Sequence, residues 1–179
     1  LSATATTGFP EPLQEIVCAG EALRIDDAVR RAASIGGGPV RLVNQYGPTE
    51  THVATSHVLG DEPACWPDLP VIGAPIHGLV VRIEDEDGDA VSIGTTGELV
   101  VEGDGVALGY LDGPDGGFEH REDVRRYRTG DLARCREDGR LEYLGRRDEQ
   151  LKIAGYRVEP GEIESTLAGV DRKSTRLNS

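Results

Sequence analysis

A chain of 179 residues with 32 acidic and 19 basic side chains is long enough for a buried core and carries a formal net charge of −13. That excess of acids argues against a general nucleic-acid surface, which needs clustered Lys and Arg. No apolar stretch approaches the roughly 20 residues of a membrane span. Because the three cysteines, Cys18, Cys65 and Cys135, are far apart, neither a zinc site nor a disulfide framework is predicted. We expect a cytoplasmic protein that binds neither nucleic acid nor membrane.

Neither end of the chain has the pattern of a natural terminus. The sequence contains no Met, and residues 1–10 lack the patterns of signal and transit peptides, so we expect the amino end to lie inside a longer protein. Residues 171–179 break the acidic amphipathic pattern before them and resemble the translation of a sequencing adapter. We therefore predict a non-native tail there.

The first half predicts a strand, a helix and a second strand. The strand spans residues 15–19, and the helix runs from about Ala22 to Ser34 with its apolar residues on one side. Gly and Pro at 36–39 end the helix, and residues 40–43 form the second strand. This order indicates a parallel α/β unit at about 13–52, with ligands expected at the carboxyl ends of its strands.

The second half has short apolar runs separated by turn signals, among them Asp-Gly at 87–88 and Glu-Asp-Gly at 137–139, which predict an antiparallel, barrel-like region at about 53–147. The arginines at 125, 126, 128 and 147 are interpreted as solvated loop charge. A last helix should begin near Pro160, with Glu162 and Glu164 at its positive end. The predicted strands span residues 53–59, 78–84, 98–102, 133–136, 140–145 and 150–153.

The most informative run is N-Q-Y-G-P-T-E, from Asn44 to Glu50, which combines an aromatic ring, a permissive Gly, a rigid Pro, a hydroxyl and a carboxylate. Gly-Pro pairs also mark tight turns in every fold class, so the run alone leaves a ligand-free turn open. It closely resembles the adenine-binding motif of the adenylation domains of non-ribosomal peptide synthetases. These domains belong to the adenylate-forming family of AMP-dependent synthetases and ligases.

Three further motifs follow in the order of that family. Residues 97–111 resemble its GEL…GY segment, residues 127–132 match YRTGDL, and residues 145–164 match GRxDxQxKxxGxRxExxEIE. The resemblance covers about Leu13 to Val170. By contrast, Gly94–Gly97 lacks the Lys that follows a phosphate loop, so we interpret it as the turn before Glu98.

The resemblance implies a mixed α/β fold. Residues 1–147 would form the carboxyl-terminal part of the large adenylation subdomain, and residues 148–170 the hinge and the start of a small lid. The family's phosphate loop would precede Leu1 and its catalytic lysine would follow Val170. We therefore expect this chain alone to be inactive.

The resemblance also assigns roles in binding ATP or AMP. Tyr46 would stack on adenine with Asn44 reading its edge, helped by Gln45 and Gly47 in the same loop. Thr49 would contact the α-phosphate and Glu50 would bind Mg²⁺, both as catalytic residues. Asp131 would accept the ribose hydroxyls, although it also suits a turn or cap, and Arg146 would add donors. Tyr46 alone would also suit a half-buried core position.

Further roles concern the lid and the amino-acid substrate. Asp148 corresponds to the hinge, although an Asp there also suits an exposed turn. Lys152 is a further catalytic candidate on the lid strand, and Gly155 would let a phosphopantetheine arm approach the thiolation face. The matching substrate-pocket positions are Val17, Ala19, Gln45, Val53 and Ala54.

The implied function is formation of an aminoacyl-AMP and its transfer to a phosphopantetheine thiol. The implied partners are an amino acid and the peptidyl carrier and condensation domains of the same synthetase. An acyl-CoA or aryl-acid ligase of the same family remains an alternative, and a non-catalytic nucleotide-binding or interaction module is an alternative from another class. Pro48 and the run at 72–76 favour the synthetase.

Overall fold

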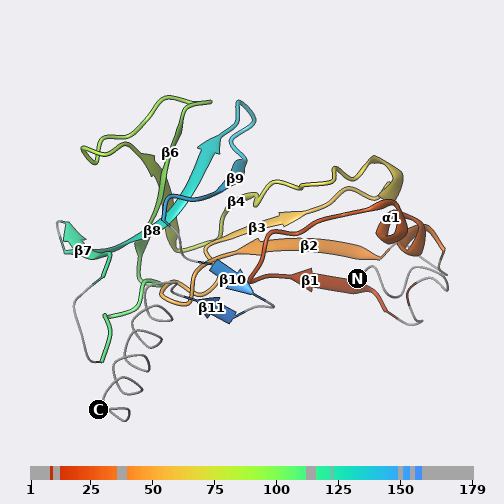
Figure 1. The fold of residues 1–179 in the computed structure, drawn as a ribbon, viewed down its shortest axis with the longest axis horizontal. Coiled ribbons are helices and arrows are strands. Elements are labelled where there is room, and N and C mark those ends of the chain that lie inside the picture. Colours follow the sequence, from red (N-terminus) through yellow and green to blue (C-terminus); the bar gives the residue numbers. More distant parts are fainter. Residues whose placement is uncertain are drawn as a thin grey trace, which may run out of the picture.

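The computed structural model places two sheets side by side, one extending to the right in Figure 1 and one on the left. Strand residues outnumber helical residues in the described part, and the predicted mixed α/β class is confirmed at that level. None of the helices in the described part is long and apolar enough to cross a membrane. The structure describes residues 9, 13–35, 40–111, 116–121 and 123–148, and the backbone of 151–153 and 156–158.

The right-hand sheet, sheet A, has the strand order β1-β2-β3-β4. Strand β1 (Glu15–Cys18) runs parallel to β2 (Arg41–Tyr46), and helix α1 (Asp27–Ser34) lies between them in sequence. Strands β3 (Thr55–Val58) and β4 (Ala74–Pro75) join it in antiparallel pairings. The predicted strand–helix–strand unit is therefore present, extended by two antiparallel strands.

Helix α1 begins five residues later than predicted, so the expected start near Ala22 is wrong. Asp26 caps the helix, because its Oδ1 accepts a hydrogen bond from the Val29 amide at 2.8 Å. The preceding Ile25 amide donates to the Asp68 carbonyl at 2.9 Å, a tertiary contact that holds this segment outside the helix. The buried side of α1 packs with Leu42 and Trp66 in a core of its own.

The second sheet, sheet B, is antiparallel throughout. Its main path is β5-β6-β8-β7, and β9 pairs with β8. The predicted turns at 87–88 and 137–139 are confirmed by the Gly88 amide bonded to Asp85 and the Gly139 amide bonded to Arg136. The strands are β5 (Leu79–Glu84), β6 (Thr96–Gly103), β7 (Phe118–Arg121), β8 (Val124–Cys135) and β9 (Leu141–Arg146).

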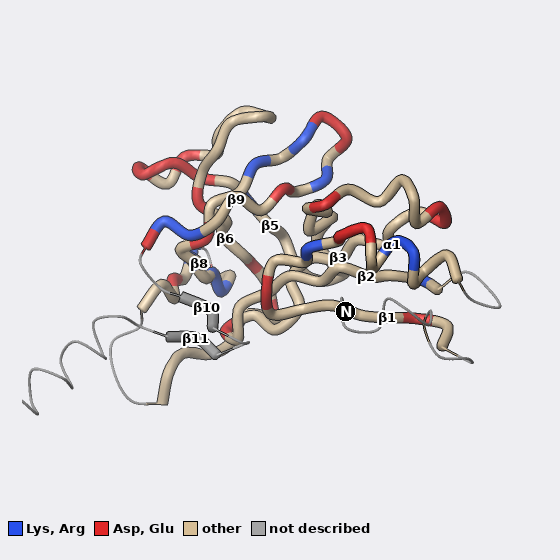
Figure 2. The backbone as a smooth tube through the Cα atoms, turned by 45° about the vertical axis from the view of Figure 1, so that its right-hand side comes forward, with Lys and Arg blue, Asp and Glu red and all other residues tan. Residues whose placement is uncertain are grey.

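Strand β8 is the largest difference from the sequence-based expectation, which places a strand only at 133–136. The interpretation of Arg126 and Arg128 as solvated loop charge is wrong for both. Arg126 is buried and forms ion pairs with Glu84 at 2.5 Å and with Glu102 at 2.8 Å, and Arg128 pairs with Glu98 at 2.6 Å. In Figure 2, basic and acidic segments lie near one another around β8 and β9. Cross-strand ion pairing hides the alternation that usually identifies a strand.

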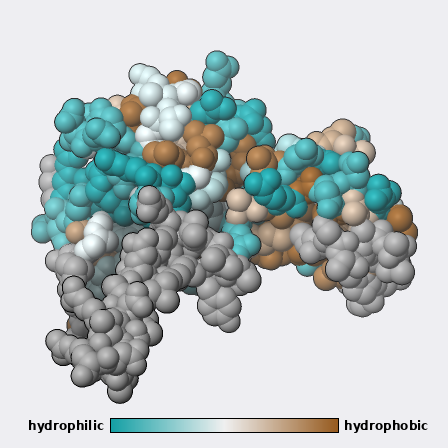
Figure 3. All heavy atoms as spheres, in the orientation of Figure 1, coloured by the Kyte–Doolittle hydropathy of each residue, from teal (hydrophilic) through white to brown (hydrophobic). Residues whose placement is uncertain are grey.

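One apolar core joins the two sheets. It combines Tyr46, Ala54 and Ile72 from the side of sheet A with residues of sheet B such as Leu99 and Val101. A bridge between Gly73 and Leu141 links the segment before β4 to the start of β9. Figure 3 shows apolar surface between the two parts and a mostly hydrophilic face over sheet B. The apolar core therefore extends from one sheet into the other, and it includes Tyr46 of the heptad.

The last described elements form a two-stranded ribbon. Strands β10 (Leu151–Ile153) and β11 (Tyr156–Val158) pair antiparallel, which confirms a strand ending at Ile153. The predicted helix from Pro160, the tail at 171–179 and the helix stop at 36–39 lie outside the described residues.

Candidate functional site

The heptad turns sharply at the end of β2. Residues Asn44–Tyr46 belong to the strand, and the Ala54 amide returns to the Tyr46 carbonyl at 2.7 Å. A Cβ added at Gly47 would lie 1.6 Å from the His52 carbonyl oxygen, so only glycine fits this close approach. The backbone of His52 itself has a φ of 54°. The close approach in this turn therefore explains the Gly of the motif without any ligand.

Tyr46 and Asp131 meet across the two sheets. The Tyr46 phenol donates to Asp131 Oδ2 at 2.5 Å, and both side chains are buried. Burial, followed by the negative charge of Asp131, raises the pKa of Tyr46 well above its ordinary value. The phenol therefore stays protonated and remains a donor to the carboxylate. Two motifs 85 residues apart in sequence converge at this contact.

Arg146 joins Asp131 to Asp148. Its Nη1 donates to Asp131 Oδ1 and to the Thr129 carbonyl, both at 3.1 Å. Its Nε and Nη2 donate to the two oxygens of Asp148, both at 2.6 Å, in the bidentate geometry that suits a guanidinium. Gly130 has a φ of +71°, and a Cβ there would lie 2.7 Å from Arg146 Nη2. The Gly of the YRTGDL motif thus leaves room for this guanidinium.

Tyr143 is a member of the site that sequence reasoning missed. Its ring centroid lies 6.0 Å from that of Tyr46. Burial, with the charge of Asp131 as the next cause, raises the pKa of Tyr143 to about 12. Simple alternation along β9 would place Tyr143 and Arg146 on opposite faces, but the pairing of β8 with β9 shifts register just after Leu132, so the sequence carries no signal for this position.

Glu50 lies on the other side of the heptad turn and is buried. The Tyr110 phenol donates to Glu50 Oε1, and the Ala107 amide donates to the Glu50 carbonyl at 2.8 Å. Tyr110 belongs to the GEL…GY segment, so this motif too contacts the heptad. The sequence indicates the segment but assigns no role to Tyr110.

The remaining candidate nucleotide-binding residues differ in their burial. Thr49 is exposed in the turn and Gln45 is half-buried. Asn44 is buried, and its amide donates to the Val71 carbonyl at 2.9 Å, so it has a structural partner beside any role at adenine. The assignments of these residues stay predictions.

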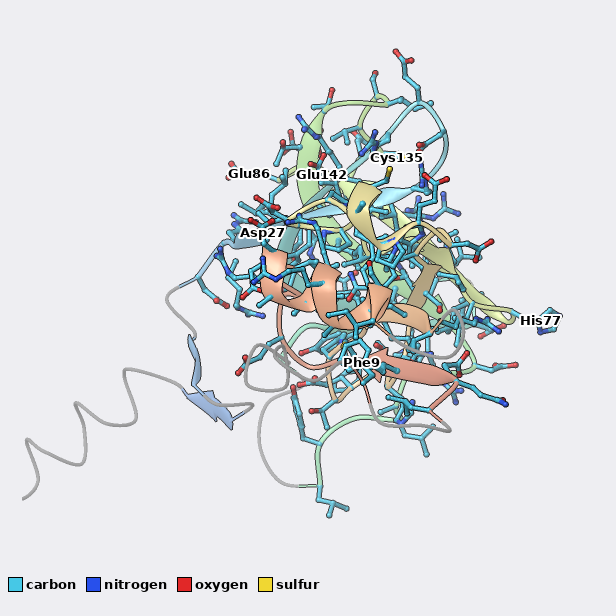
Figure 4. All side chains as sticks on the ribbon, turned by 90° about the vertical axis from the view of Figure 1, so that its right-hand side faces the viewer. Phe9, Asp27, His77, Glu86, Cys135 and Glu142 are labelled. Carbon is cyan, nitrogen blue, oxygen red and sulfur yellow. The ribbon has the colours of Figure 1, made fainter. Side chains whose placement is uncertain are left out.

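The five predicted pocket residues do not form one described hollow. Val17 pairs in register with Val43, which places Val17 and Gln45 on the same face of sheet A. Ala54 is fully buried in the shared core, whereas Val17 and Ala19 are exposed. Two surface hollows lie elsewhere. One is lined by Asp27 of α1 and the other by Cys135 and Glu142, and these three residues are labelled in Figure 4. The substrate pocket stays a prediction.

The donor set suits a magnesium ion that also binds nucleotide phosphates. Within the described ranges no three His, Cys, Asp or Glu side chains gather into a metal cluster. Mg²⁺ is commonly held by one or two carboxylates together with substrate phosphates, and the oriented, buried Glu50 carboxylate fits that arrangement.

The lid candidates are described only in part. Asp148 is bonded to Arg146 as given above, and the Lys152 backbone pairs with Arg157 between β10 and β11. Gly155 lies outside the described residues. The hinge, lysine and thiolation roles therefore stay predictions.

Comparison with known proteins identifies the class. The sequence profile described as AMP-binding enzyme matches residues 2–111. The chain therefore belongs to the AMP-binding enzyme family. It is 41% identical over 165 residues to gramicidin S synthase 2 of Brevibacillus brevis, and 41% identical over 165 residues to tyrocidine synthase 2 of Brevibacillus parabrevis. Each alignment covers 89% of this chain but only 4% of the relative.

Solved structures agree with this placement. PA1221, a non-ribosomal peptide synthetase protein containing adenylation and PCP domains, is 36% identical with a TM-score of 0.75, covering 88% of this chain and 33% of that one. The Vibrio cholerae adenylation domain AlmE, in complex with glycyl-adenosine-5'-phosphate, is 31% identical with a TM-score of 0.73, covering 91% and 32%. The resemblance to part of a synthetase adenylation domain is thus confirmed.

Proposed function

We propose that this chain supplies the nucleotide-binding part of an enzyme that activates an amino acid with ATP. A carboxylate oxygen of the amino acid attacks the α-phosphorus, the bond to pyrophosphate breaks, and an aminoacyl-AMP forms. The phosphopantetheine thiol of a carrier domain then attacks the acyl carbon, the bond to the phosphate oxygen breaks, and a thioester forms as AMP leaves. The single observation that supports this most strongly is the convergence of Tyr46, Asp131 and Arg146 from separate motifs.

Each residue contributes by position and charge, which is the main source of catalysis in such a displacement. Asp131 accepts hydrogen bonds from the ribose hydroxyls, because an ionised carboxylate is an acceptor only. Tyr46 offers its ring to adenine and Thr49 its hydroxyl to the α-phosphate. Arg146 donates to ribose or phosphate. Mg²⁺ held at Glu50 would supply positive charge beside the phosphates.

The other assignments concern the subdomains, the substrate pocket and the partner domains. Residues 1–147 belong to the large subdomain and residues 148–170 to the hinge and the start of the lid, with Asp148 as the hinge that lets the lid rotate between the two reaction steps. Lys152 is a catalytic residue of the lid, and Gly155 allows the phosphopantetheine arm to approach the thiolation face. Val17, Ala19, Gln45, Val53 and Ala54 select the amino acid. The carrier and condensation domains of the same synthetase are the partners. The isolated chain is expected to be inactive.

The test is Asp131→Asn in an adenylation domain that includes this chain. We expect the KM for ATP in pyrophosphate exchange to rise at least about tenfold, because an amide accepts fewer hydrogen bonds than a carboxylate. The matched control is Asp138→Asn, in the exposed turn between β8 and β9, which should leave the KM unchanged. An Asp131→Asn domain that folds normally and keeps its KM for ATP would refute the ribose role.

A further inference from the structure

Glu50 accepts hydrogen bonds from a segment, residues 107–110, to which no function has been assigned. Its carbonyl accepts from the Ala107 amide at 2.8 Å, and its carboxylate accepts from the Tyr110 phenol. Both donors come from the stretch after β6, whereas Glu50 follows β2. The main chain and the side chain of Glu50 are therefore both bonded to the loop segment that follows β6.

The ring of Tyr110 packs against aromatic neighbours. Its ring meets Phe118 edge-on, with centroids 5.1 Å apart, and Phe118 packs against the buried Tyr127 at 4.9 Å. The Tyr127 hydroxyl lies 3.4 Å from that of Tyr110. Because the Tyr110 hydroxyl donates to Glu50, its oxygen can accept from Tyr127, which makes a directed chain of two phenols ending at the carboxylate.

We propose that Tyr110 is a positioning residue for the Glu50 carboxylate, and through it for the divalent cation bound with the nucleotide phosphates. This rests on the proposed function of Glu50. A charge-assisted hydrogen bond fixes the rotamer of a carboxylate, and partners that orient metal ligands commonly change metal affinity by about 10- to 100-fold when removed. The hydroxyl of Tyr110 matters in this role, whereas its ring only packs.

The test uses an adenylation domain that includes this chain and compares Tyr110→Phe with Phe118→Leu. The first variant removes only the hydroxyl, and the second disturbs the ring packing but keeps the hydroxyl. For Tyr110→Phe we expect the Mg²⁺ concentration giving half-maximal pyrophosphate exchange at saturating ATP to rise about tenfold. Phe118→Leu should lower the melting temperature and leave that concentration within about twofold of the parent, because packing is lost but the donor remains.

A second readout does not depend on turnover. The melting temperature is measured with a non-hydrolysable ATP analogue while Mg²⁺ is increased, since a bound ligand stabilises the folded state according to its affinity. The Mg²⁺-dependent part of the shift should move to about tenfold higher Mg²⁺ in Tyr110→Phe and at least as far in Glu50→Gln.

The outcomes separate the two proposals. If Glu50→Gln changes the Mg²⁺ dependence and Tyr110→Phe does not, the positioning role is wrong and the metal role of Glu50 stands. If neither variant changes it, the metal role of Glu50 is wrong, and the inference about Tyr110 is overturned with it. If both change it and Phe118→Leu does not, the inference is supported.

Discussion

Sheets A and B are stabilised by different forces, and the candidate site lies where they meet. Sheet A is backed by helix α1 through an apolar core that includes Leu42 and Trp66. Sheet B carries, across β5, β6 and β8, a buried network of arginine and glutamate side chains centred on Arg126. Apolar packing tolerates adjustment, whereas buried charges require fixed partners. Under the proposed function, the residues that bind the nucleotide would therefore gain a rigid support from sheet B.

The contacts between the two sheets are reciprocal. Tyr46 on sheet A donates to Asp131 on sheet B, and Tyr110 beside sheet B donates to Glu50 beside sheet A. Each sheet or its adjoining loop thus supplies a phenol that donates a hydrogen bond to a carboxylate of the other side. The geometry of the site depends on both sheets being docked, and substitutions in each sheet can test this difference.

The largest effect is expected from Arg126→Met. Removing this guanidinium takes one positive partner from the buried carboxylates of Glu84 and Glu102. We expect the free energy of unfolding to fall by about 3–5 kcal/mol. Urea unfolding of the chain measures it. Arg134→Met, which breaks a more exposed pair with Glu142, is the control and should cost less than about 1 kcal/mol. Equal losses in the two variants would contradict a special role for the buried network.

A somewhat smaller loss, about 3 kcal/mol, is expected from Leu42→Ala. Leu42 is 1% exposed in the core beneath α1, so truncation leaves a cavity there. Leu69→Ala, at a position 59% exposed, serves as the control and should stay within about 0.5 kcal/mol. Added salt should change neither result, and a clear salt dependence would show that charge also stabilises sheet A.

Tyr46→Phe tests the docking of the two sheets and should cost about 2 kcal/mol, because a hydrogen bond to a buried carboxylate is lost. The same denaturant titration measures it, followed by tyrosine fluorescence and by circular dichroism. We expect both probes to report one transition, since the apolar core continues across the sheets. An unchanged free energy of unfolding would show that this bond does not couple them.

The smallest effect is expected from Asp26→Ala at the start of α1, about 1 kcal/mol, because the Val29 amide loses its cap. Thermal unfolding is sufficient to detect it. Asp61→Ala, an exposed acid outside any helix, is the matched control. A loss no greater than that of the control would mean that packing alone fixes where the helix begins.

Local sequence patterns predict some elements, and they fail where contacts with residues distant in sequence determine the structure. The strand–helix–strand unit and the hairpin turns follow from periodicity and turn residues, and both are predictable. Most of strand β8 is not, because Arg126 and Arg128 are stable inside a sheet only with Glu84, Glu98 and Glu102, which come from other strands. The start of α1 is misplaced by periodicity because Asp68, 43 positions after Ile25, holds the preceding segment.

The same reasoning applies to the site. Motif resemblance names Tyr46, Glu50, Asp131 and Arg146, and the structure brings the first and the last two into one bonded group. It does not assign Tyr110 or Tyr143, because a tyrosine in a strand or loop has no sequence signal that distinguishes a carboxylate donor from a packing residue. Their roles depend on which elements lie opposite them.

The short strand β4 has a consequence for contacts between molecules. Pro75 stands opposite Thr55 on β3 and has no amide hydrogen to offer on its outer side. An added strand needs a row of such donors, and two residues with one proline cannot provide it. This rim of sheet A is therefore protected against strand-by-strand aggregation, and replacing Pro75 by a β-branched residue would remove that protection.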